Sequence, residues 1–332
     1  MQSNLSYPKV KIAVSNCLMG VNCRFNGGHS QDDFVTERLA KYVDFIPFCP
    51  EDAVMGTPRE SVRLYRVDGE IKVMGGRSQT DYTEGLTEYN QQMIQRLVEL
   101  AVDGAIVKAK SPSCGLERIK IYRPTGEWLG SDNGVGQGLF TQMLQQAMPW
   151  LGVEEEGRLL DPWLRENFVL QVFTQARWRE LMDQSPGLAD FQAFHRRHKF
   201  LFLSKNEAIY RQMGPLVAAT TQKNQSESML KYQALLHELL ATKTRRSAMI
   251  NVLEHLYGYV KDKVSDGQKA IYRETLEEFR SGVVPLIAMI KLLRQWIEDY
   301  QVTYLQDQWI LDPYPADLAL RSDLKAFKNV ER

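Results

Sequence analysis

The sequence predicts an α/β domain built on a mainly parallel sheet, followed by an all-helical domain. Residues 9–150 alternate short apolar runs with amphipathic stretches, as the strands and helices of a parallel sheet do. From residue 191 onward no strand pattern interrupts the helical periodicity. The chain of 332 residues also exceeds one typical domain, which favours two.

Short apolar runs mark the core strands of the first domain. Residues 10–15 and 44–48 are two such runs, and residues 104–108 form a third. A helix is expected over residues 32–42, because the polar stretch SQDD can cap its first turn. Residues 83–102 have the apolar stripe of an amphipathic helix.

Turn signals supply the remaining elements of this domain. Asp68 and Gly69 form a strong hairpin turn pair, so residues 61–73 are expected to make a two-stranded hairpin. A second hairpin is expected over residues 119–128, around a Pro-Thr-Gly turn. The glycine-rich run 134–138 lacks the spacing of a dinucleotide-binding loop. We expect it to let the start of a following helix approach the site.

The second half of the chain begins with a connecting helix. Asp161 and Pro162 are a good helix start, which predicts a helix over residues 163–182. Later helices are expected to break at residues 214–215, 221–226, 242–244 and 265–267. The expected divisions of the chain are a first domain over 1–156, a connector over 157–186 and a helical domain over 187–332.

Neither a signal peptide nor a membrane span is evident in the sequence. The N-terminal residues lack a long apolar core, and no stretch approaches the roughly 18 apolar residues that a span needs. All four cysteines lie within the first 114 residues, unlike a secreted disulfide framework. We therefore expect a cytoplasmic protein without a membrane partner, whose thiols stay reduced and available to metal.

A net charge of zero hides an asymmetry between the two halves. Residues 191–300 hold 17 Lys and Arg against 11 Asp and Glu, and the rest of the chain carries the compensating acid, including the run 154–156. The basic residues considered as contacts to an anionic partner such as RNA are Arg196, Arg197, Lys199, Lys243, Arg245 and Arg246. Solvated helix faces explain the same counts equally well.

Three cysteines follow predicted strands. Cys17 comes after the first strand, Cys49 after the second and Cys114 after the third. Because parallel strands end at one edge of a sheet, we expect these thiols to converge there. No CxxC pair is present, which argues against a zinc ribbon. Thiolates in a reducing compartment favour an iron–sulfur cluster or zinc. Buried free thiols are the alternative, as is a site that Cys23 completes.

Other polar residues share the loops of these cysteines. Glu51 lies two residues after Cys49 and is a candidate general base, and Ser111 opens the loop of Cys114. The alternative interpretation is that each residue only shapes the turn in which it lies. The candidate substrate contacts beside these loops are Arg24, Arg59 and Lys110. An equally good interpretation is that each is an ordinary charged residue of the surface.

Separated motifs in these loops carry a family resemblance. The stretches CLMGVNCRFNGG, FCPE, TPRE and KAKSPSCG resemble the TudS-type thiouracil desulfidases, over about residues 9–150. Later stretches, FHRRHKFL, YRQMGPLVA and YLQDQ, resemble the YbgA-like helical domain. The two domains in one chain resemble the RudS-like tRNA 4-thiouridine desulfidases. The resemblance implies a Rossmann-like three-layer first domain.

The resemblance also implies a cofactor and roles for the loop residues. A [4Fe-4S] cluster is expected on Cys17, Cys49 and Cys114, with the fourth iron free for the substrate's sulfur; Cys23 is the less favoured ligand. Glu51 is expected to deprotonate the attacking water, and Ser111 to stabilise or protonate the intermediate. The implied reaction is non-redox, with tRNA as the partner and hydrosulfide as a product.

Two alternatives remain at this point. The first is a desulfidase of free thiolated bases, in which the helical domain serves dimerisation. The second is a non-enzymatic iron–sulfur sensor that binds RNA or protein. The sensor requires four cysteine ligands, so a Cys23→Ser variant that keeps its cluster counts against it.

Overall fold

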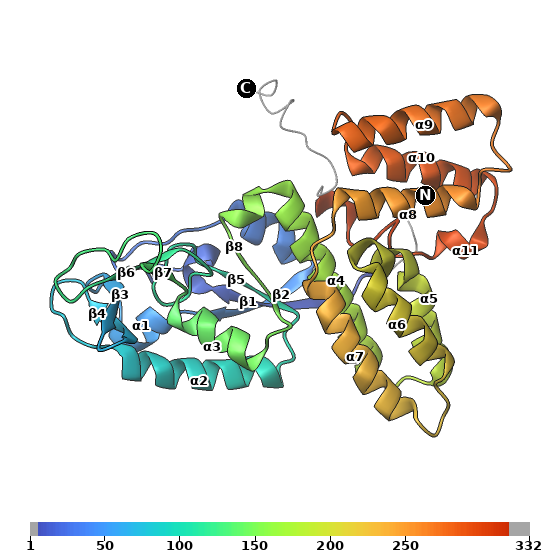
Figure 1. Cartoon of the computed structure of the whole chain (residues 1–332). Coiled ribbons are helices and arrows are strands. Elements are labelled where there is room, and N and C mark those ends of the chain that lie inside the picture. Colours follow the sequence, from blue (N-terminus) through green and yellow to red (C-terminus); the bar gives the residue numbers. More distant parts are fainter. Residues whose placement is uncertain (1–5, 319–332) are drawn as a thin grey trace. The chain divides into compact units, whose positions relative to one another are not determined.

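The computed structural model describes residues 6–318 of the chain. The chain divides into two compact units, Met1–Phe168 and Val169–Arg332. The first unit contains the strands, and the second is helical (Figure 1). The division falls inside α4 (Pro162–Asp183), the helix whose start at Asp161 and Pro162 the sequence predicts. The predicted order of an α/β unit and a helical unit is confirmed.

A four-stranded parallel sheet forms the centre of the first unit. Its strands are β1 (Val10–Ser15), β2 (Val43–Phe48), β5 (Gly104–Val107) and β8 (Gly152–Glu155), in the order β2-β1-β5-β8. All three pairings are parallel. The strands therefore end at the same edge, which is where ligands bind in sheets of this type.

A smaller mixed sheet lies beyond that edge. The predicted hairpin is present as β3 (Val62–Val67) and β4 (Glu70–Gly75), joined through Asp68 and Gly69 in left-handed conformation. The remaining strands are β6 (Ile119–Tyr122) and β7 (Val135–Gly136). The second expected hairpin is reduced to a single bridge between Tyr122 and Trp128.

Two amphipathic helices pack together on one face of the parallel sheet (Figure 1). These are α2 (Thr83–Glu99) and α3 (Leu139–Ala147). Leu97 and Leu144 are fully buried in the core that the two helices share with the strands. Phe140 of α3 stacks on Phe48 at the end of β2, with ring centroids 4.2 Å apart, so the start of α3 is fixed near the strand ends.

Three expectations of the sequence differ from the structure in this unit. The helix expected over 32–42 is a π-helical turn, Phe34–Arg38, followed by a 3₁₀ turn, Leu39–Lys41. Asp32 caps its start as expected, because its side chain accepts from the Val35 amide and its carbonyl from the Thr36 amide. Neither β8 nor the short helix α1 (Pro50–Met55) was expected. The glutamates of β8 hide the apolar pattern by which a strand is recognised in a sequence. Helix α1 is too short for its residues to show helical periodicity.

The second unit consists of the end of α4 and a series of further helices. Their bounds are α5 (Leu188–Lys205), α6 (Glu207–Ala218), α7 (Gln225–Ala241), α8 (Arg246–Gly258), α9 (Asp266–Ser281), α10 (Leu286–Asp299) and α11 (Thr303–Gln306). The break expected at 214–215 is wrong, because α6 continues through Pro215. A proline near the last turn removes one helical bond, and the burial of Met213 and Val217 retains the helix.

Buried aromatic residues form the centre of the helical unit. Trp178, Phe191, Phe194 and Tyr232 pack against one another in edge-on and tilted contacts. His198 is buried among them and accepts a hydrogen bond from Arg177.

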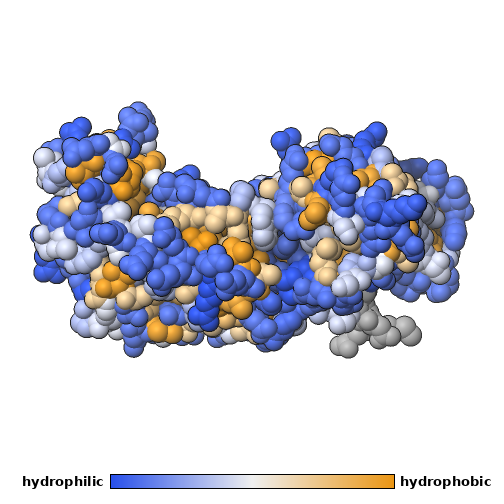
Figure 2. All heavy atoms as spheres, turned by 90° about the horizontal axis from the view of Figure 1, so that it is seen from below, coloured by the Kyte–Doolittle hydropathy of each residue, from blue (hydrophilic) through white to orange (hydrophobic). Residues whose placement is uncertain are grey.

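None of the described helices is long and apolar enough to cross a membrane. Hydrophilic residues cover most of the face drawn in Figure 2, with apolar residues in separate patches between them.

Candidate functional site

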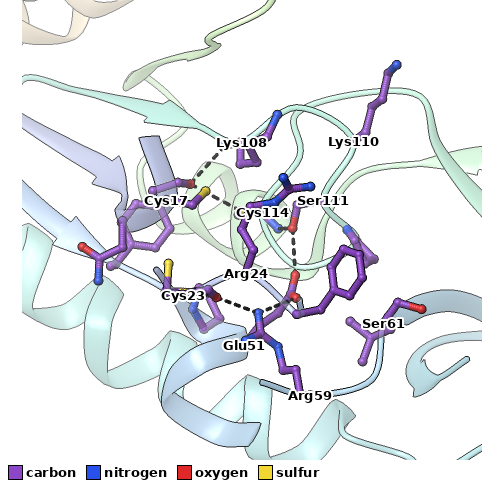
Figure 3. A pocket seen from close by; sticks show the side chains of 18 of the residues that line it. Cys17, Cys23, Arg24, Glu51, Arg59, Ser61, Lys108, Lys110, Ser111 and Cys114 are labelled. Atoms are coloured by element: carbon purple, nitrogen blue, oxygen red, sulfur yellow. Dashed lines mark hydrogen bonds and ion pairs between the residues drawn. The ribbon is translucent and has the colours of Figure 1, made fainter. Parts of the chain in front are cut away.

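Three adjacent strands of the parallel sheet each lead into a loop that carries a cysteine. Cys17 follows β1, Cys49 follows β2 and Cys114 follows β5, with β1 in the middle. All three line one pocket of about 320 Å³, which Cys23 also lines (Figure 3). The structure thus brings the four cysteines of the chain together at the edge where the strands end.

Local structure holds each of the strand-end cysteines. Cys17 lies in a 3₁₀ turn, Asn16–Met19, which Gly20 ends in left-handed conformation. Cys49 caps α1, its sulfur accepting from the Asp52 amide at 3.4 Å. The Ser15 hydroxyl contacts the sulfur of Cys114 at 3.4 Å and accepts from the Lys108 amide, so it joins β1 to the loop after β5.

The thiols raise one another's pKa. A hydrogen bond to Cys17 raises the pKa of Cys23 to about 11. The bond to Cys23, followed by burial, raises the pKa of Cys49 far above its ordinary value. Burial raises the pKa of Cys114 to about 12. These three thiols are therefore neutral at pH 7 unless a cation stabilises their thiolates, which is what a bound metal group does.

A carboxylate stands beside the thiols in the same pocket. Glu51 Oε1 accepts from the Ser111 hydroxyl at 3.0 Å (Figure 3). The same oxygen of Glu51 accepts from the Ser113 hydroxyl at 2.8 Å. Its Oε2 accepts from Arg59 at 2.9 Å. Three donors from two loops thus fix the orientation of this carboxylate, and hydrogen bonds of this charge-assisted kind are the stronger ones.

Arg59 binds several groups around the pocket at once. Its side chain is 5% exposed. Besides Glu51, its guanidinium donates to the carbonyls of Cys23 and Gly56 and to the Thr57 hydroxyl. Arg59 therefore joins the first cysteine loop to α1. Arg59 is one of the candidate substrate contacts that the sequence predicts, and in the structure it lines the pocket while it binds these protein groups.

The start of α3 lies directly against the Cys114 loop. Gly138 donates to the Gly115 carbonyl at 2.8 Å, and Thr141 Oγ1 donates to the Cys114 carbonyl at 2.7 Å. A Cβ placed on Gly138 would lie 2.6 Å from the amide nitrogens of Cys114 and Gly115. The glycine-rich run therefore has the expected effect of letting a helix start approach the site.

Acidic residues at and just after the end of β8 bind the segment that follows β5. Glu155 accepts from the Leu116 amide at 2.7 Å. Glu156 accepts from the Ala109 amide and pairs with Lys108. The sequence reading counted these residues as net negative charge, whereas the structure uses them to hold the backbone after β5.

The remaining predicted contacts of the first unit lie at the margin of the pocket. Arg24 is half-buried and its guanidinium lies 5.9 Å from the Phe25 ring centroid. Lys110 is exposed, in left-handed conformation, and extends away from the cysteines (Figure 3).

The basic residues predicted to contact RNA do not gather into one patch. Arg196 makes a bidentate pair with Asp307 at 3.0 and 2.7 Å, and Arg197 approaches the same carboxylate. Arg246 begins α8 and donates to the Arg280 carbonyl. Lys243 and Arg245 precede that end of α8, whereas Lys199 is on α5 and lines a pocket near the other end.

Sequence reasoning missed several residues of the first pocket. Ser113 and Ser15 were not singled out, although both are buried and bonded to site residues. Helix α1 was missed as well. A proline at its first position followed by Glu51 and Asp52 is a helix-start pattern that was available in the sequence.

The donor set fits a cluster better than a single ion. Among residues 6–318, no group of three or more His, Cys, Asp or Glu side chains lies close enough to hold one metal ion. The thiols instead come from separate loops around a cavity of about 320 Å³. Soft thiolates spread around a cavity are the ligands of iron–sulfur clusters.

Comparisons with known proteins give matches for both units. A family model described as 2-thiouracil desulfurase matches residues 12–156, and one described as protein of unknown function (DUF1722) matches residues 199–315. The uncharacterized protein YbgA of Escherichia coli (strain K12) is 26% identical over 157 residues, which are 47% of this chain and 93% of that protein. The uncharacterized protein YbbK of Bacillus subtilis (strain 168) is 31% identical over 147 residues, 41% of this chain and 90% of that protein.

A solved structure, that of the [4Fe-4S]-dependent thiouracil desulfidase TudS, is also similar to this chain. The match is 28% identical, with a TM-score of 0.37, and covers 46% of this chain and 94% of that one.

The family matches follow the order of domains that the motifs predicted. The first lies within the unit that holds the cysteine pocket, and the second lies within the helical unit. The alternative of a non-enzymatic sensor is therefore not supported. The chain belongs to the 2-thiouracil desulfurase family, and it is a desulfidase whose catalytic domain is joined to a YbgA-like helical domain.

Proposed function

We propose that this enzyme removes the sulfur of 4-thiouridine in tRNA, leaving uridine and releasing hydrosulfide. One observation carries the proposal. The pocket places a carboxylate, oriented by Arg59 and by two serine hydroxyls, beside cysteines from three strand ends. Hydrolysis of a C=S bond requires a base for water, which Glu51 would supply, and a partner for sulfur, which a cluster on the cysteines would supply.

We assign a [4Fe-4S] cluster to Cys17, Cys49 and Cys114. Their position supports the assignment, because the three cysteines follow adjacent strands and line one pocket. When bound, a cluster with one iron free of protein ligands supplies a Lewis acid for the thiocarbonyl sulfur. Cys23 lines the same pocket and is assigned no ligand role.

The side chains of the chain then handle water and protons. Glu51 accepts a proton from the water that attacks C4 of the base, and Arg59 and Ser113 hold the carboxylate in place. The Ser111 hydroxyl stabilises or protonates the intermediate. One C–O bond forms and the C–S bond breaks. The substrate and one water molecule yield uridine, hydrosulfide and a proton.

The helical unit is proposed to bind the tRNA. The excess of Lys and Arg over residues 191–300 supports contacts to phosphate groups. Because the reacting base must reach a pocket between protein loops, it has to leave its stack in the RNA.

The test is desulfuration of tRNA by the full chain, reconstituted anaerobically. We expect the absorbance band of 4-thiouridine to disappear and hydrosulfide to appear in equal amount. A Glu51→Gln variant with the same iron content should be at least 100-fold slower, the lower range for loss of a general base. A persistent band with fully loaded wild-type protein would refute the proposal.

A desulfidase of free thiolated bases is the second candidate. Every residue that lines the pocket belongs to the first unit, the part that the 2-thiouracil desulfurase model matches. This candidate predicts turnover of free 4-thiouracil with no turnover of tRNA, so both substrates are assayed side by side.

A further inference from the structure

A second pocket lies within the helical unit, away from the cysteines in sequence. It has a volume of about 300 Å³, at the lower end of the range for ligand pockets. The residues that line it come from α5, α6 and the end of α8: Lys199, Phe200, Leu203, Glu207, Tyr210, Arg211, His255 and Tyr259. Aromatic and basic side chains thus share one small cavity, a combination that the mechanism of the first pocket does not use.

The aromatic rings of this pocket are arranged in stacked pairs. Tyr259 stacks on Tyr304, with centroids 5.5 Å apart and an interplanar angle of 17°. Tyr259 is nevertheless 40% exposed. Tyr210 stacks on His195 at 5.7 Å and 11°. Tyr259 is therefore a ring held by the stacked Tyr304 and by Phe200, which packs against it edge-on, while part of the ring stays open to solvent. A partly exposed, well-held ring is the form of a stacking platform for a planar ligand.

A lysine lies among these rings. Lys199 Nζ is 5.7 Å from the Tyr304 ring centroid and 5.1 Å from that of Phe200. Within residues 6–318, the side chains that act on the charge of Lys199 are Tyr304, Tyr259 and Tyr210, with a hydrogen bond to Tyr304 and no carboxylate among them. The pocket's carboxylate, Glu207, already pairs with Arg211 at 2.6 Å. The charge of Lys199 is therefore available to an anion that enters the pocket.

We propose that this pocket binds an unpaired nucleotide of an RNA chain. Its base stacks on Tyr259, and a neighbouring phosphate contacts Lys199. A planar base beside a phosphate matches an open ring beside a cation, whereas an acidic peptide would use Lys199 and leave the ring unused. The inference rests on the proposed action on tRNA and specifies where the helical unit grips the strand.

The experiment measures binding of the full chain to a short single-stranded RNA without 4-thiouridine, by fluorescence anisotropy. We expect Tyr259→Ala to weaken binding roughly five- to hundred-fold, the range for loss of one stacked base, and Tyr259→Phe to retain it. Lys199→Ala should lower the salt dependence of log K by about 0.7, the value for one phosphate of a single strand.

A matched control is available on α7. Lys231 is an exposed lysine outside the pocket, paired with Glu227, and Lys231→Ala should bind like the wild type. All variants should desulfurate a free thiolated base at the wild-type rate, because none of these residues lines the first pocket. That rate shows that the first unit is intact, and an unchanged far-UV circular dichroism spectrum shows that the helical unit is folded.

The outcomes separate this inference from the proposed function. If the wild type binds RNA and desulfurates tRNA while Tyr259→Ala and Lys199→Ala behave like it, this inference alone fails. If the wild type binds no RNA, both fail. Equal affinity for an abasic oligonucleotide, or competition by polyglutamate at the same concentration as RNA, shows a site for anions without a base and overturns the assignment.

Discussion

Replacing Gly138 by alanine should disrupt the cysteine pocket by steric contact alone. Gly138 has φ −65° and ψ 145°, a conformation open to any residue, so alanine adds no backbone strain. Its Cβ would lie 2.6 Å from the amide nitrogens of Cys114 and Gly115, whereas ordinary contacts begin at 3.4 Å. The start of α3 and the Cys114 loop must therefore separate by about 0.8 Å.

That separation has a calculable cost. The bond from Gly138 to the Gly115 carbonyl is 2.8 Å long and would stretch to about 3.6 Å, beyond hydrogen-bond length. The neighbouring bond from Phe140 to the Ser113 carbonyl would weaken as well. Overpacking costs about 1–3 kcal/mol, and each lost bond costs about 0.5–1.5 kcal/mol. We expect a total of about 2–4 kcal/mol and a fall in Tm of about 5–15 °C for a unit of this size.

The same substitution elsewhere supplies the control. Gly157 has φ −65° and ψ −35°, and the nearest atom to its added Cβ is Ala109 Cβ at 4.0 Å. Gly157→Ala should therefore melt about 1–4 °C above the wild type, because alanine at an unstrained site lowers the entropy of the unfolded chain by about 0.4–1 kcal/mol. Both variants are compared by circular dichroism melting and by iron and sulfide content after reconstitution. If Gly138→Ala melts like Gly157→Ala and takes up the same iron, the proposed steric role of the glycine is refuted.

Three further predictions concern the site and the helical unit. Ser113→Ala removes a 2.8 Å bond to the Glu51 carboxylate and should lower kcat about ten-fold at unchanged iron content; an unaltered kcat would contradict its positioning role. Cys114→Ser should abolish cluster uptake while Cys23→Ser retains it, as the visible absorbance of reconstituted protein will show; loss in both would make Cys23 a ligand. Burial lowers the pKa of His195 and His237 to about 4. The unfolded chain, with histidine pKa about 6.5, binds more protons between these values. The helical unit should therefore lose stability as pH falls from 6.5 to 4, by up to about 1.4 kcal/mol per histidine and pH unit. Urea unfolding monitored by tryptophan fluorescence tests this, and a flat profile would refute it.

Much of the arrangement of the first pocket follows from local sequence. Apolar runs bounded by turn residues identify β1, β2 and β5, and a cysteine lies in the segment that follows each of them. Since parallel strands share a C-terminal edge, this order along the chain already implies that the cysteines meet. The change from alternating strands and helices to helices alone likewise predicts the two units.

Other features depended on tertiary contacts. The role of Arg59 comes from partners on two loops, and that of Ser113 from Glu51, which is 62 residues away. β8 contains glutamates that resemble surface charge in the sequence, but the folded chain uses them to bind backbone amides. Residue type alone does not reveal such partners.

The sequence by itself determined which residues stand at the strand ends and that a helical unit follows the sheet, because strand and helix patterns are local. Tertiary structure alone decided how close those loops approach and which charges are already paired. Gly138 illustrates the approach of the loops, since only the folded structure reveals that no room exists there for a Cβ. Arg196 and Lys199 illustrate the pairing of charges: they are neighbours on α5, yet one is held by Asp307 and the other faces a pocket. Pairing depends on distances between distant segments, and no local pattern encodes those distances.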